Sequence, residues 1–153
     1  MKTYISKSPE ETKKFAMDLA NKFPKGVIAL SGELGSGKTT FVQGFAEGLG
    51  IKEKIISPTF VLIRQHPIPK TKKNLPAGRQ ALFHIDLYRL ESVDVEILGI
   101  DEIIRNPNNI VLIEWAEKIK HLLPKNTYWI LLEVVEDNTR TITEVVRFND
   151  SNH

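Results

Sequence analysis

The stretch Gly32-Glu33-Leu34-Gly35-Ser36-Gly37-Lys38-Thr39 decides the fold, because it satisfies every fixed position of the phosphate-loop pattern G-x-x-x-x-G-K-[ST]. A short apolar run, 26–30, precedes it and has the composition of a buried parallel strand. Apolar side chains recur at helical spacing over 41–49, and Gly48 and Gly50 then predict the end of a helix. Strand, glycine-rich loop and helix therefore stand in the order that a nucleotide-binding loop requires.

The residue types of this loop fit phosphate chemistry. Its three glycines allow positive φ and a close backbone approach, so that successive N–H groups and the helix N-terminus point at an anion. Lys38 is expected to reach the β- and γ-phosphates as a point charge, and the Thr39 hydroxyl to complete the shell of a Mg²⁺ ion. An ordinary glycine-rich turn is the plainer interpretation, but the flanking strand and helix favour nucleotide binding.

Composition limits the classes of protein to consider. The 153 residues, 41% of them hydrophobic, suffice for a single domain over 1–150 with a proper core. A net charge of +2 is too small to indicate nucleic-acid binding by itself. The sequence has no cysteine, which excludes disulfides, thiolate metal sites and thiol nucleophiles and fits a reducing compartment. No run has the pattern of a signal peptide or a membrane span, so we expect a soluble, cytoplasmic protein without a membrane partner.

The rest of the chain predicts further elements around the loop. Ser8-Pro9-Glu10-Glu11 is typical of a capped helix start, and the apolar residues that follow share one face. Pro58 indicates an extended loop before a strand at 60–63. The segment 66–80 is rich in proline and lysine, which predicts a basic, flexible insertion loop. A solvated loop is favoured there over a nucleic-acid contact.

Two later strands carry acids near their ends. The run 81–88 places Asp86 near the end of one strand, and Ile110-Val111-Leu112-Ile113-Glu114 has the form of a Walker B strand. Glu114 is therefore favoured as the second protein group near Mg²⁺, over a solvated strand terminus. Two β-rich runs, 128–135 and 141–148, predict a hairpin. Together these patterns predict an α/β, P-loop NTPase-like domain: a mainly parallel sheet flanked by helices, with an antiparallel C-terminal hairpin.

Five blocks of this sequence together resemble the TsaE (YjeE) family of small bacterial ATPases, which serves in making threonylcarbamoyladenosine on tRNA. They are the phosphate loop through Phe41, Ser57-Pro58-Thr59-Phe60, His84-Ile85-Asp86-Leu87-Tyr88-Arg89-Leu90, Gly99-Ile100-Asp101-Glu102 and Leu112-Ile113-Glu114-Trp115. Phosphate loops occur in many families, whereas the His-x-Asp-Leu-Tyr-Arg-Leu and Ile-Glu-Trp blocks make the match specific. The order and spacing of the blocks cover nearly the whole chain.

The resemblance implies a set of site residues. ATP would be held by the loop and its flanks: Thr12, Gly32, Glu33, Leu34, Gly35, Ser36, Gly37, Lys38, Thr39 and Thr40. Thr39 and Glu114 would hold Mg²⁺, while Thr59 would belong to a switch-type loop near the γ-phosphate. Asp86 would be essential for hydrolysis and could order an attacking or metal-bound water, the alternative being a carboxylate that caps neighbouring amides. Thr12 is alternatively a packing residue, and Trp115 either belongs to the core or lines a nucleotide or partner surface.

The leading hypothesis that the resemblance implies is an ATPase that drives the cycle of a TsaD–TsaB threonylcarbamoyl-transferase complex, with indirect contact to tRNA. A small-molecule P-loop kinase remains open, but it would need an arginine-rich lid, and Arg64, Arg79 and Arg89 are scattered. A nucleotide-gated binding module with little turnover also remains open, because no arginine is an evident finger. A GTPase is disfavoured, since the sequence has no Asn/Thr-Lys-x-Asp motif.

Overall fold

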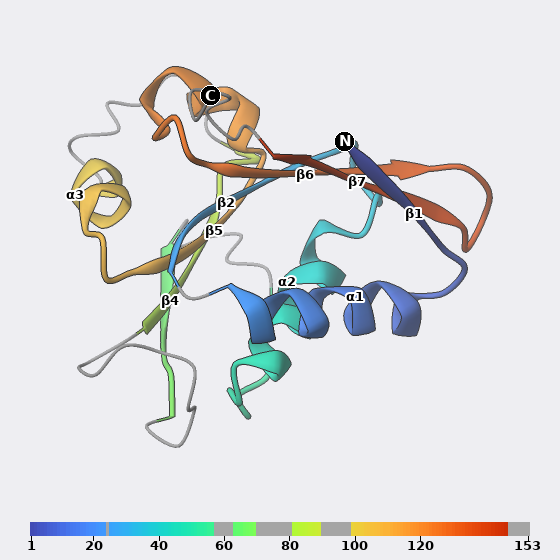
Figure 1. Cartoon of the computed structure of the whole chain (residues 1–153), viewed down its shortest axis with the longest axis horizontal. Helices are drawn as coiled ribbons and strands as arrows, with labels where there is room; N and C mark the ends of the chain where they lie inside the picture. Colours follow the sequence, from blue (N-terminus) through green and yellow to red (C-terminus); the bar gives the residue numbers. More distant parts are fainter. Residues whose placement is uncertain (24, 57–62, 70–80, 90–98, 147–153) are drawn as a thin grey trace, which may run out of the picture.

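The molecule is built on one twisted sheet with helices on both sides (Figure 1). A computed structural model describes residues 1–23, 25–56, 63–69, 81–89 and 99–146, and within them seven strands form the sheet. The strands are β1 (Lys2–Ser6), β2 (Gly26–Ser31), β3 (Ile63–Pro67), β4 (Ala81–Asp86), β5 (Ile110–Glu114), β6 (Tyr128–Val134) and β7 (Arg140–Val146). The helices are α1 (Pro9–Lys22), α2 (Lys38–Gly48), α3 (Ile100–Arg105) and the 3₁₀ helix η1 (Ala116–Leu122).

The strand order β1-β7-β6-β2-β5-β4-β3 gives the sheet a parallel centre and antiparallel sides. Strands β6, β2, β5 and β4 run parallel, whereas β7, β1 and β3 pair antiparallel with their neighbours. The predicted P-loop NTPase-like fold class is thereby confirmed, including the C-terminal hairpin. Because parallel strands end at the same edge, the carboxyl ends of β2, β4 and β5 lie together there, and Glu114 is in register with both Leu30 and Asp86.

Two separate apolar clusters cover the faces of the sheet. One packs α1 and α2 against side chains such as Leu30, Leu82 and Leu112, and the other packs α3 and η1 against Ile85 and Ile113. Figure 1 shows α1 and α2 side by side below the sheet, with η1 on the opposite side. Helix α2 begins at the phosphate loop, so its contact with α1 and the sheet fixes the direction in which the loop faces.

Local sequence signals account for the first helix. Ser8 is its N-cap, with Oγ accepting the Glu11 N–H at 3.1 Å, and the Glu11 carboxylate accepts the Lys7 N–H at 2.7 Å. The strand β1 that precedes it is not indicated by the sequence patterns above. It forms because its backbone pairs with β7, a contact that no local pattern announces.

The segment around the expected insertion loop is described only in part. Strand β3 continues through Pro67, and His66 is buried with its Nδ1 3.0 Å from Glu53 Oε2, so the strand enters the range 66–80 by two residues. Residues 57–62, with Thr59, and 70–80, with most of the expected loop, lie outside the described residues. Among the helices in the described ranges, none is long and apolar enough to cross a membrane.

Candidate functional site

The phosphate loop occupies the turn between β2 and α2, and glycine is required at two of its positions. Gly37 immediately precedes α2 with φ 101°, which an L side chain rarely adopts. At Gly32, where φ is 151°, an added Cβ would lie 2.6 Å from Ser36 Oγ and against the carbonyl oxygen of Leu132. The loop therefore packs against β6 at its start and leads directly into α2 at its end.

Lys38 places its ammonium in the middle of this turn. Its side chain is buried, and Nζ donates hydrogen bonds to the carbonyl oxygens of Gly32 at 2.5 Å and Glu33 at 2.9 Å. Burial lowers the pKa of Lys38, an effect that the nearby carboxylates of Glu114, Glu117 and Asp86 oppose. The ammonium is thus partly desolvated and held within the loop whose N–H groups are expected to face an anion.

A hydrogen-bonded chain joins the start of α2 to the ends of two strands. Thr39 Oγ1 donates to Glu114 Oε1 at 3.0 Å, and His84 Nε2 lies 2.6 Å from Glu114 Oε2. Strand register explains the meeting, because Asp86 pairs with Glu114 and His84 with Leu112, so all four side chains share the sheet face that α2 covers. Both carboxylate oxygens of Glu114 are therefore engaged.

Asp86 lies beside this chain at the end of β4. The residue is 7% exposed, and its Oδ1 accepts the N–H of Tyr88 at 3.0 Å, as expected of a carboxylate that caps a strand end. Its negative charge also acts on Lys38. The position therefore suits both a cap and an acid at the edge of the phosphate site.

Trp115 forms a wall of the site. It follows Glu114 directly in the left-handed region, with φ 60°, which is uncommon for a residue other than glycine. The centroid of its ring lies 4.2 Å from Lys38 Nζ, 5.2 Å from the ring of Tyr88 and 5.9 Å from Lys118 Nζ. The indole therefore lies over the lysine of the phosphate loop while it also packs, partly buried, against the core cluster that contains Ile113.

Arg140 and His84 also reach the site, although the sequence analysis assigned neither of them a role there. Arg140 Nη2 donates to the carbonyl oxygen of Gly35 at 3.2 Å, while Nη1 donates to the carbonyl oxygens of Glu136 at 3.0 Å and Asp137 at 2.9 Å. No local signal marks this contact, because it depends on how the β6–β7 hairpin lies across the loop. For His84 a signal existed, since it stands two residues before Asp86 in a strand and so shares its face.

Other expected site residues lie apart from the Lys38–Glu114 centre. Thr12 is buried in α1 with Oγ1 2.7 Å from Ser6 Oγ, and among the described residues its hydroxyl has no hydrogen bond to the phosphate loop. Leu34 is 71% exposed at the tip of the loop, and Thr40 follows Thr39 on α2 with a half-buried side chain. A nucleotide contact for Thr12, and the role of Thr59, stay predictions.

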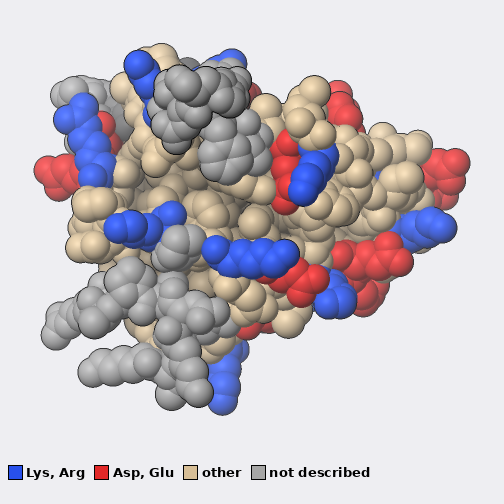
Figure 2. Space-filling view, viewed as in Figure 1, with Lys and Arg blue, Asp and Glu red and all other residues tan. Residues whose placement is uncertain are grey.

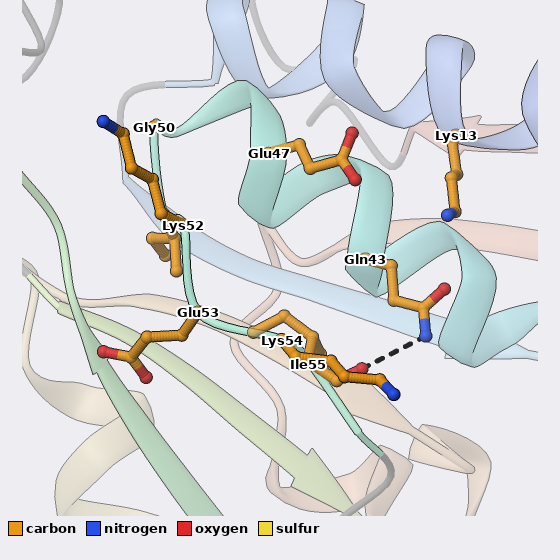
Figure 3. Close-up of a pocket in the computed structure, with 9 residues that line it drawn as sticks. Lys13, Gln43, Glu47, Gly50, Lys52, Glu53, Lys54 and Ile55 are labelled. Atoms are coloured by element: carbon orange, nitrogen blue, oxygen red, sulfur yellow. Dashed lines mark hydrogen bonds between the residues drawn. The ribbon is translucent and has the colours of Figure 1, made fainter.

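The surface near α2 also carries a groove of about 570 Å³ (Figure 3). Side chains of both charges line it, and within it Gln43 Nε2 donates a hydrogen bond to the Ile55 carbonyl oxygen at 3.1 Å. Its lining residues are Lys13, Gln43, Glu47, Gly50, Ile51, Lys52, Glu53, Lys54 and Ile55. Figure 2 likewise shows cationic and anionic side chains interspersed on the visible face, which fits the small net charge. Neither surface has the single sign of charge that favours a polyanion.

The donor atoms around Glu114 fit a magnesium ion with a nucleotide. The Thr39 hydroxyl and the Glu114 carboxylate are hard oxygen donors, 3.0 Å apart in their hydrogen bond. Mg²⁺ commonly takes one or two carboxylates together with phosphate oxygens and water. The described ranges hold no cluster of three or more His, Cys, Asp or Glu side chains suited to a metal.

Comparison with known proteins agrees with this arrangement. A family model described as threonylcarbamoyl adenosine biosynthesis protein TsaE matches residues 6–142. A Bacillus subtilis protein named tRNA threonylcarbamoyladenosine biosynthesis protein TsaE is 40% identical over 137 residues, which are 89% of this chain and 80% of that protein. The Treponema pallidum protein of the same name is 37% identical over 141 residues, covering 91% and 96% of the two chains. The crystal structure of Bacillus subtilis YdiB superposes with a TM-score of 0.73 at 33% identity, covering 97% of this chain and 86% of that one. The chain therefore belongs to the TsaE family.

Proposed function

We propose that this protein binds ATP with Mg²⁺ and hydrolyses it in the formation of threonylcarbamoyladenosine on tRNA. The observation that carries the proposal is the hydrogen bond of 3.0 Å between Thr39 and Glu114, which joins the end of the phosphate loop to the end of β5. In a P-loop ATPase these two positions supply the hydroxyl and the acid near the metal. The names of the relatives, which refer to tRNA threonylcarbamoyladenosine biosynthesis, support the process.

Each side chain then has a task. The loop N–H groups and the Lys38 ammonium would bind the phosphates, and Thr39 and Glu114 would hold Mg²⁺, which would supply charge neutralisation to the transferring phosphoryl group. Asp86 orders the water that attacks, since phosphoryl transfer depends chiefly on positioning and charge stabilisation. Thr59 remains proposed as a contact near the γ-phosphate, and Thr12 as a contact to the nucleotide.

The partner is proposed to be a TsaD–TsaB type threonylcarbamoyl-transferase complex, with tRNA contacted through it. Arg140 donates to the Gly35 carbonyl oxygen and to carbonyl oxygens of the hairpin, so its guanidinium is already engaged in hydrogen bonds within the protein. Many P-loop proteins hydrolyse slowly until a partner supplies an arginine to the transition state. Weak hydrolysis by the isolated chain and acceleration by the complex are therefore expected.

The test is steady-state hydrolysis of ATP with Mg²⁺, for the chain alone and with purified TsaD and TsaB. Lys38→Ala serves as the blank, and Lys14→Ala is the matched control, because Lys14 is 76% exposed on α1 and pairs with the neighbouring Asp18. Stimulation that is lost in Lys38→Ala and kept in Lys14→Ala would support the proposal. Rapid hydrolysis by the chain alone, unchanged when the partners are added, would favour a kinase. Tight ATP binding without stimulated hydrolysis would favour a nucleotide-gated binding module.

A further inference from the structure

His84 makes a polar contact with Glu114 at a buried position. The residue lies on β4 with 0% of its surface exposed, and it shares its face with Leu82 and Leu112 of the core that packs against α2. Its Nε2 lies 2.6 Å from Glu114 Oε2, while Nδ1 has no hydrogen-bond partner in the described part of the chain. An imidazole is a costly side chain to bury for packing alone, because its polar atoms lose water. The contact with Glu114 is thus the feature that distinguishes it from a leucine.

The direction of this hydrogen bond follows from the form of the carboxylate. An ionised carboxylate only accepts hydrogen bonds, and with Glu114 in that form Nε2 carries the hydrogen and donates it. The second oxygen, Oε1, accepts from Thr39 at 3.0 Å, which leaves the carboxylate held from two elements at once: β4 through His84 and α2 through Thr39. Rotation of the carboxylate would break one bond or the other. A charge-assisted hydrogen bond is also stronger inside a buried site than in water.

We propose that His84 is the positioning residue of Glu114. By holding Oε2 on the strand, it presents Oε1 toward Thr39 and toward a cation bound with the nucleotide phosphates. His84 does not itself touch the nucleotide or the metal. The inference rests on the proposed Mg²⁺-dependent binding of ATP and adds to it a residue that sets the strength of the metal-linked step. Partners that orient metal ligands typically contribute about tenfold or more to metal affinity.

The principal test compares two substitutions at this position. His84→Leu keeps similar bulk and removes the donor, whereas His84→Gln keeps an N–H that can reach the place of Nε2. The matched control is His66→Leu, because His66 on β3 is also buried, at 5% exposure, but bonds to Glu53, whose side chain is 60% exposed. Affinity for ATP is measured by calorimetry in excess Mg²⁺ and in EDTA, together with thermal unfolding of each nucleotide-free variant.

The result expected is specific to the metal. His84→Leu should reduce the gain in ATP affinity that Mg²⁺ gives by about tenfold, with affinity in EDTA unchanged, and His84→Gln should restore most of the gain. His66→Leu should leave both affinities unchanged. Three outcomes would overturn the inference in favour of a role in core packing. His84→Leu could keep the full gain in ATP affinity from Mg²⁺, it could lose as much ATP affinity in EDTA as in Mg²⁺, or His84→Gln could bind ATP no better than His84→Leu. If the wild-type protein binds ATP equally well with Mg²⁺ and in EDTA, the proposed function is overturned, and with it the role assigned to His84.

A second measurement does not depend on activity or on stable variants at position 84. Long-range ¹H–¹⁵N NMR of the wild-type protein identifies which ring nitrogen of His84 carries hydrogen. Protonation at Nε2, with exchange of that hydrogen slowed in wild type and accelerated in Glu114→Ala, would support the inference. Protonation at Nδ1 alone would overturn it, because Nε2 would then have no hydrogen to donate.

Discussion

At the scale of single residues, Asp86 combines a structural bond with a charge that faces the phosphate site. Asparagine keeps an acceptor for the Tyr88 N–H but removes the negative charge. We expect Asp86→Asn to leave ATP affinity unchanged and to lower single-turnover hydrolysis by about 100-fold, within the range for a positioned acid or base. Asp18→Asn, at a site 58% exposed on α1, is the control. Parallel loss of affinity and hydrolysis would leave Asp86 with the capping role alone.

Lys38 should give ATP binding a pH dependence. Because burial lowers its pKa in the folded protein, the ammonium loses its proton at a lower pH than an exposed lysine, which titrates near 10.5. The charged form is the one that attracts phosphate, so affinity should fall as pH rises through the lowered pKa. Calorimetric titration with ATP from neutral pH to about pH 10 measures this fall. Lys38→Arg, which keeps its charge throughout, should bind with little dependence on pH over the same interval.

At the scale of elements, the β6–β7 hairpin supports the phosphate loop through Arg140. Its guanidinium bonds hairpin carbonyl oxygens and the Gly35 carbonyl oxygen together, so it fixes the distance between the two segments. Arg140→Ala should weaken ATP affinity about fivefold, equivalent to the loss of one ordinary hydrogen bond of about 1 kcal/mol. Arg140→Lys should recover little, because one ammonium lacks the fork that spans both segments.

The control for this element is Arg105→Ala, since the Arg105 side chain is 78% exposed and pairs with Asp101 within α3. ATP affinity of Arg140→Ala equal to that of Arg105→Ala would show that the hairpin does not support the loop. Thermal unfolding of both variants shows whether Arg140→Ala acts on the phosphate loop alone or destabilises the sheet as a whole.

The close packing of α1 on α2 predicts the effect of a substitution at Gly44 on stability. At Gly44 an added Cβ would lie 2.5 Å from Lys13 Cα, so the two helix backbones are in contact. In an open helix, alanine would be about 1 kcal/mol more favourable than glycine. Here Gly44→Ala should instead destabilise the protein by about 3 kcal/mol, because the helices must separate. Urea unfolding measures the change, and Glu47→Ala on the exposed side of α2 is the control. A stabilised Gly44→Ala variant would contradict the close packing.

At the scale of the whole molecule, the sequence predicts what is encoded in contiguous patterns. The phosphate loop with its strand and helix, the β5 run ending in Glu114 and the C-terminal hairpin were all predictable, because each pattern determines its own backbone. The contacts of Arg140 and the ring contact between Trp115 and Tyr88 were not predictable. They join segments that are distant in sequence, and their geometry depends on strand order and on one unusual backbone conformation.

The pairing of β1 with β7 has a consequence for the order of folding. The ladder joins Lys2 to Glu144 and Ser6 to Arg140, so its two strands are separated by nearly the whole described chain, and closing so long a loop is entropically slow. The parallel centre, with β2 and α2 around the phosphate loop, does not need β1 as a neighbour. In pulse-labelled hydrogen exchange during refolding, we expect the amides of β2 and α2 to gain protection first and those of β1 last. Simultaneous protection would instead indicate a single concerted barrier. On this pathway the part of the sheet that carries the phosphate loop forms before the outermost strand β1 is added.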